Sequence, residues 1–121
     1  MTTLIETSFR RAIEAAEDGN GDARVTLETH GEPHTWLQLS YDTINAAYPL
    51  AEEPTNVLTA LSITLPEYVE VSAWEAHKFV TFEHGAEPLP DLVRFVQDYT
   101  AKVLHIAEPD TVFRVVEESG Q

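Results

Sequence analysis

The feature that most constrains the fold is a change in the spacing of hydrophobic residues along the chain. In residues 3–17 and 89–106 they recur at every third or fourth position, which is the spacing of an amphipathic helix. Between these segments, several short stretches place them at every second position, which is typical of strands that bury one face. Such a chain needs a sheet and helices that cover each other, because each has only one apolar side.

Both helices have recognisable starts. Thr3 and Glu6 have the spacing of a capping box, and two glycines within residues 17–22 indicate where the first helix ends. In the second helix Pro90 suits the first turn, and Asp91 lies near the positive end of the helix dipole.

The strands are predicted from alternation. Residues 23–30 and 34–41 are expected to pair as an antiparallel hairpin, because a Gly and a Pro separate them. A three-stranded meander is expected over residues 56–84. Residues 42–56 contain two prolines, which predicts an exposed connection. The segment 111–118 is either a further strand or a frayed end.

Together these elements predict the α+β class: a two-layer sandwich in one domain spanning residues 1–121. The expected architecture is an antiparallel sheet of about five or six strands, with the N-terminal and C-terminal amphipathic helices on one face. A chain of 121 residues that is 43% hydrophobic has the size and composition for a single modest core.

The charge of the chain restricts its partners. Seven Lys and Arg residues against 21 Asp and Glu give a formal net charge of −14, which opposes binding to nucleic acids and anionic membranes and favours a basic protein partner. The same acidity also serves solubility alone. There is no signal peptide pattern and no long apolar run, so the expected location is the cytoplasm.

Two histidines raise the question of a metal site. His30 and His34 flank the predicted hairpin loop, where a cross-strand pair has Cβ atoms about 5 Å apart. A zinc site needs further ligands. The candidates are Glu28, Glu32, His77 and His84. The alternative is that both histidines are exposed turn residues, and on that interpretation no metal is assigned.

Catalytic motifs are absent from the sequence. The chain has no cysteine, no Gly-x-Ser-x-Gly elbow, no phosphate-binding loop and no dinucleotide fingerprint. No catalytic residue and no cofactor is therefore assigned.

An aromatic and acidic stripe is the remaining candidate site. If Val69 and Val71 face the core, the residues between and beyond them face the other way, and Trp36 likewise lies opposite its apolar neighbours. Aromatic anchors with a charged rim suit a protein interface. The predicted partner-binding residues are Trp36, Tyr68, Glu70 and Trp74.

These observations favour a non-catalytic acidic protein-binding module, comparable to an immunity protein or a secretion chaperone. The predicted order of elements resembles that of the small acidic chaperones of secretion systems in architecture alone, without a shared residue motif. One alternative is a small metal- or ligand-binding enzyme that uses His30 and His34 with nearby carboxylates. Another is a structural homodimer whose aromatic face lies between the two copies.

Overall fold

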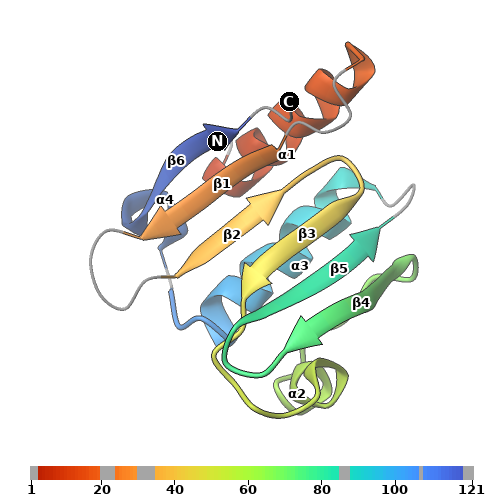
Figure 1. Cartoon of the computed structure of the whole chain (residues 1–121), viewed down its shortest axis with the longest axis vertical. Coiled ribbons are helices and arrows are strands. Elements are labelled where there is room, and N and C mark those ends of the chain that lie inside the picture. Colours follow the sequence, from red (N-terminus) through yellow and green to blue (C-terminus); the bar gives the residue numbers. More distant parts are fainter. Residues whose placement is uncertain (1–2, 20–23, 30–34, 85–87, 107, 119–121) are drawn as a thin grey trace.

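Six antiparallel strands form one sheet, and helices lie against one of its faces (Figure 1). The computed structural model describes residues 3–19, 24–29, 35–84, 88–106 and 108–118. The strands are β1 (Arg24–Thr29), β2 (Trp36–Leu39), β3 (Thr43–Ala47), β4 (Val69–Glu75), β5 (Phe79–His84) and β6 (Phe113–Glu118), and the helices are α1 (Leu4–Glu17), α2 (Pro54–Ala60), α3 (Leu89–Lys102) and α4 (Pro109–Val112).

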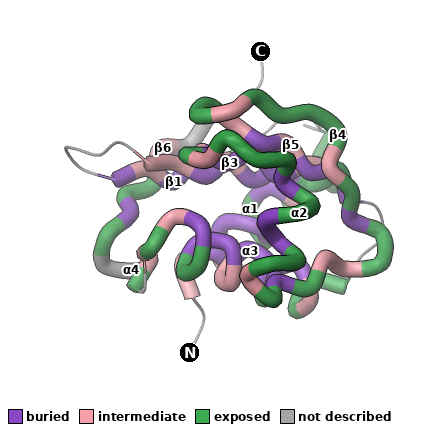
Figure 2. The backbone as a smooth tube through the Cα atoms, turned by 90° about the horizontal axis from the view of Figure 1, so that it is seen from below, coloured by how far each residue is buried: buried purple, intermediate pink, exposed green. Residues whose placement is uncertain are grey.

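The strand order β4-β5-β3-β2-β1-β6 contains antiparallel neighbours throughout. Figure 2 shows the sheet edge-on, with α1 and α3 together on one side of it. The predicted α+β two-layer sandwich is therefore confirmed. The predicted first hairpin is β1 paired with β2, and the final segment forms β6 at the edge of the sheet beside β1.

The helix ends follow the capping chemistry that the sequence carries. The Thr3 side chain accepts a hydrogen bond from the Glu6 backbone N–H at 3.2 Å, so α1 begins as predicted. The second predicted helix, α3, ends at Lys102 rather than at residue 106. His105 has a φ of 58°, which is left-handed backbone and cannot continue a helix.

Residues 42–65 differ from the prediction. The expected exposed connection contains β3, a central strand between β2 and β5, whose Ile44 and Ala46 are buried. Helix α2 takes the place of the start of the expected meander. Pro54 pre-sets the first helical turn, and the Glu53 side chain caps the helix by accepting a hydrogen bond from the Thr55 N–H. The meander prediction is wrong in this part, and its second and third strands are β4 and β5.

Helix α2 ends in a hydrogen-bonded reversal. The Ser62 N–H donates to the Thr59 carbonyl at 3.1 Å, and the Ile63 N–H donates to the Leu58 carbonyl at 2.9 Å. This is the Schellman pattern, which needs left-handed backbone at the residue after the cap. Ser62 takes that position with a φ of 59°.

The core lies between the helices and the sheet. Phe82 of β5 packs edge-on against Phe95 of α3, with ring centroids 5.0 Å apart, and against Tyr99 at 5.9 Å. The Tyr99 hydroxyl donates to the Ala47 carbonyl at 2.6 Å, and the Tyr48 hydroxyl donates to the Glu52 carbonyl. Burial raises the pKa of both phenols, and the charges of nearby acidic groups raise that of Tyr48 further.

No helix in the described ranges has both the length and the hydropathy that spanning a bilayer requires.

Candidate partner-binding face

The sheet face opposite α1 and α3, called the open face below, carries mainly polar side chains. Side chains alternate between faces along a strand, and directly opposite residues on neighbouring strands share a face. The observed register therefore assigns to the open face Arg24, Thr26 and Glu28 of β1, Trp36 and Gln38 of β2, Thr43, Asn45 and Ala47 of β3, Glu70, Ala73 and Glu75 of β4, Phe79, Thr81 and Glu83 of β5, and Arg114 and Val116 of β6.

A chain of side-chain hydrogen bonds crosses four strands of the open face. The Thr81 hydroxyl donates to the Asn45 carbonyl oxygen at 2.5 Å, and the Asn45 amide donates to Gln38 Oε1 at 3.1 Å. The Gln38 amide in turn donates to the Thr26 hydroxyl at 3.3 Å. These four residues, called the polar row, lie directly opposite one another in the strand register, so the backbone positions them for this chain.

An apolar strip lies beside the polar row. Phe79 is opposite Ala47, and continuing the β2–β3 register by one residue places Trp36 on the other side of Ala47. Both rings are half-buried, so each has surface that a partner can cover. Beyond Trp36, Arg114 makes an ion pair with Glu28, with Nη2 to Oε1 at 2.5 Å. The strip therefore combines two aromatic rings with a charged pair at one end.

Two carboxylates face each other across β4 and β5. Glu70 is directly opposite Glu83, and both residues are exposed. Like charges in this arrangement repel and destabilise the strand pair. A cation placed between the two carboxylates would relieve that repulsion, so this end of the open face has the electrostatic character to attract a basic group.

A β-bulge changes the predicted face of Trp74. The β4–β5 register shifts between Val71 and Ala73, so Trp74 is opposite Val80, which is buried among the core residues. The Trp74 ring also packs edge-on against the buried Tyr48, with centroids 6.0 Å apart. Trp74 thus lies on the helix side of β4 and is 38% exposed, and the expectation that it shares a face with Glu70 is wrong.

The other predicted interface residues are separated. Tyr68 lies in the turn before β4 and is 63% exposed. Trp36 and Glu70 both belong to the open face, but three strand spacings lie between β2 and β4, which is about 14 Å across the sheet. The alternation of residues 77–84 would have identified Phe79 as a neighbour of this face, and it is the residue that the prediction missed.

The described histidines do not converge. His84 is 5% exposed and packs edge-on against Phe9, whereas His77 lies in the turn between β4 and β5 with Nδ1 3.0 Å from the Pro49 carbonyl. Within the described ranges, no three His, Asp or Glu side chains are grouped so that they could hold a metal ion. His30 and His34 lie outside the described residues, as does Glu32.

No protein-family model, no curated protein and no solved structure matches the chain.

Proposed function

We propose that this protein is a non-catalytic module that binds a basic protein partner through the open face of its sheet. In kind it is comparable to an immunity protein or a secretion chaperone, each of which acts by covering a surface of another protein. The observation that carries the proposal is the apolar strip of Trp36, Ala47 and Phe79, which lies half-exposed on a sheet face opposite α1 and α3.

The strip has the composition of an interface centre. Tryptophan is among the residues that contribute most to binding energy, and a half-buried ring gains further contact area at a small cost in side-chain entropy. The polar row beside it offers amide and hydroxyl groups whose positions are fixed by their own hydrogen bonds. Such preorganised groups lose little freedom when a partner binds.

Charge supports a basic partner. The chain carries a formal net charge of −14, and Glu70 and Glu83 place two like charges directly opposite each other on the open face. Charges of this kind increase the association rate with a partner of opposite sign, and this increase becomes smaller as salt is added. A homodimer through the same face would bring these carboxylates toward their own copies, which favours a different protein as the partner.

The two sides of the sheet allow a controlled experiment. A photo-reactive benzoylphenylalanine at Phe79 reports on the open face, and the same residue at Trp74 reports on the helix side. We expect a partner to be cross-linked from position 79 and not from position 74.

Affinity measurements with that purified partner then test the energetics. Trp36→Ala should weaken binding by about 2 kcal/mol or more, which is roughly 30-fold, whereas Trp74→Ala should change it less than threefold. Thermal unfolding of both variants shows whether each is folded. A Trp36→Ala variant that folds and binds with unchanged affinity, or a partner whose contact surface is acidic, contradicts the proposal.

A further inference from the structure

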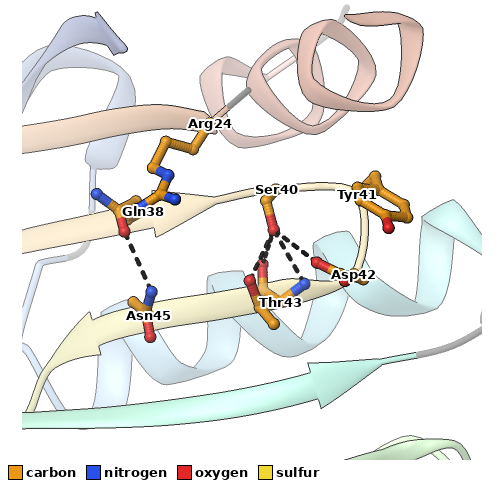
Figure 3. A pocket seen from close by; sticks show the side chains of 7 residues that line it. All are labelled: Arg24, Gln38, Ser40, Tyr41, Asp42, Thr43 and Asn45. Atoms are coloured by element: carbon orange, nitrogen blue, oxygen red, sulfur yellow. Dashed lines mark hydrogen bonds between the residues drawn. The ribbon is translucent and has the colours of Figure 1, made fainter. Parts of the chain in front are cut away.

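A polar pocket lies at the end of the open face where β2 turns into β3. It has a volume of about 180 Å³, and Arg24, Gln38, Ser40, Tyr41, Asp42, Thr43 and Asn45 line it (Figure 3). Pockets for drug-sized ligands are larger, at roughly 300–1,000 Å³. This one has room for a ligand of a few heavy atoms or for a single side chain of another protein.

Arg24 is the only cation among the lining residues, and its guanidinium makes no salt bridge with the side chains that the structure describes. Arg10, Lys78 and Arg114 each form a salt bridge with a glutamate. By contrast, no hydrogen bond or ion pair joins the Arg24 side chain to another side chain that the structure describes, although its backbone lies opposite Glu118 of β6. The one carboxylate among the lining residues, Asp42, contacts Ser40 at the hairpin turn rather than Arg24, so the guanidinium is available for an external carboxylate.

The amides in the pocket present donors. The Gln38 and Asn45 carbonyl oxygens already accept hydrogen bonds within the polar row, from Asn45 and Thr81 respectively. Each amide nitrogen donates one of its two N–H groups within the polar row, Asn45 to Gln38 and Gln38 to Thr26. The second N–H of each amide is not used in the row. The two amides therefore add hydrogen-bond donors beside the guanidinium of Arg24.

The hydroxyls at the hairpin are occupied with one another. Ser40 Oγ accepts from the Thr43 N–H at 3.0 Å and lies 2.7 Å from Thr43 Oγ1 and 3.2 Å from Asp42 Oδ1. Asp42, the anionic residue of the lining, lies at the hairpin turn, whereas Arg24 extends from β1 toward Gln38 (Figure 3). The donor-rich part of the pocket is thus at the Arg24 end.

We propose that this pocket binds a carboxylate, which Arg24 holds with a planar pair of N–H groups and which the side-chain amides of Gln38 and Asn45 also contact. Guanidinium and carboxylate geometries match in two parallel hydrogen bonds, which a lysine cannot reproduce. The carboxylate belongs either to a small molecule or to an acidic residue of a polypeptide. The site goes beyond the function proposed above and does not depend on it.

Nuclear magnetic resonance of the ¹⁵N-labelled protein tests the site directly. The signals to follow are Arg24 Nε–Hε and the side-chain amides of Gln38 and Asn45, during titration with sodium acetate at constant ionic strength. Arg24→Gln removes the proposed ligand-binding group. Arg94→Gln is the matched control, because Arg94 is an exposed arginine of α3 on the other layer. Arg24→Lys separates charge from bidentate geometry.

We expect saturable shifts at these three side chains, with an affinity at least tenfold weaker in Arg24→Gln and within twofold of wild type in Arg94→Gln. Arg24→Lys should also bind more weakly than wild type. Equal affinity in Arg24→Gln overturns the proposal, as do shifts that sodium chloride reproduces at the same ionic strength.

Two peptides distinguish the sources of the carboxylate. Acetyl-Ala-Glu-Ala-amide should bind more tightly than acetyl-Ala-Gln-Ala-amide, and equal binding of the two contradicts recognition of a carboxylate. Binding of the Glu peptide at least tenfold tighter than acetate supports a polypeptide source. Binding no tighter than acetate supports a small-molecule source.

Discussion

Raising the pH from 9 to 11 should destabilise the protein, and replacing Tyr99 with phenylalanine should remove a defined part of that loss. The Tyr99 side chain is 2% exposed, and its hydroxyl donates to the Ala47 carbonyl at 2.6 Å. Burial disfavours the phenolate, and the neighbouring Tyr48 acts in the same direction. The pKa of Tyr99 is therefore well above its ordinary value of 10.0.

The sign of the pH effect on stability follows from the Tyr99 phenol, which keeps its proton to higher pH in the folded protein than in the unfolded chain. Below about pH 10 Tyr99 is protonated in both states, and its full contribution to stability is present. Above about pH 10 the unfolded chain loses the phenol proton while the folded protein keeps it, so stability falls as the pH rises toward the folded pKa. For one group, the loss between pH 9 and pH 11 is about 1.4 kcal/mol.

Urea unfolding of the wild type and of Tyr99→Phe at pH 8, 9, 10 and 11 measures this contribution. At pH 8 the variant should be less stable by about 1–2 kcal/mol, because the Ala47 carbonyl loses its donor. That gap should narrow by about 1.4 kcal/mol between pH 9 and pH 11, since the variant cannot ionise there. Tyr48 is present in both proteins and cancels in the difference. A gap that stays constant across this range would refute the reasoning.

Three further predictions test the packing of Phe82, the end of helix α2 and the repulsion between Glu70 and Glu83. Phe82→Ala should destabilise the protein by about 3–5 kcal/mol in urea unfolding, because it leaves a cavity against Phe95; a loss below 1 kcal/mol would contradict the packing. Ser62→Gly should stabilise it by about 0.5–1 kcal/mol, because glycine adopts the left-handed φ of 59° without steric cost, and no gain in thermal midpoint would argue against strain there. Glu83→Gln should raise stability by a few tenths of a kcal/mol at low salt by removing repulsion with Glu70, and a gain that persists in 1 M salt would point to another cause.

The sequence predicted the elements whose local signals and tertiary environment agree. In α1 the Thr3 cap and the hydrophobic stripe both favour a helix, and in β2 the alternation matches burial on one face only. For α3 the stripe was predicted correctly, but its end was placed four residues too late. The left-handed conformation of His105 carries no sequence signal comparable to a glycine.

The region 42–65 was misassigned because its turn residues outweighed its hydrophobic spacing. Ile44, Ala46 and Tyr48 do alternate, but asparagine, alanine and a following proline are depleted in strands. Only the pairing of β3 with two neighbours makes this segment a central strand. In α2 the buried residues Pro54, Val57 and Leu58 have the i, i+3, i+4 spacing of a helix, which a strand interpretation leaves unexplained.

The candidate interface was predicted in part. Trp36 and Glu70 belong to the open face, as alternation within their strands indicated. Trp74 does not, because the bulge near Ser72 adds one residue to β4 relative to β5 and reverses the alternation beyond it. A strand read alone cannot reveal such a shift, since its register depends on the partner strand. The Arg24 pocket likewise combines residues of three strands and the hairpin turn, which alternation does not bring together.

The polar row has a direction, and that direction couples four positions. Every bond runs the same way, from the Thr81 hydroxyl through the Asn45 and Gln38 amides to the Thr26 hydroxyl. Reversing the Asn45 amide alone would set its oxygen against the Gln38 oxygen, so neither amide can turn unless the other turns with it. A substitution at Asn45 or Gln38 leaves partners unmatched on both neighbouring strands. We therefore expect these four positions to change together during evolution, as correlated substitutions on β1, β2, β3 and β5, rather than one at a time.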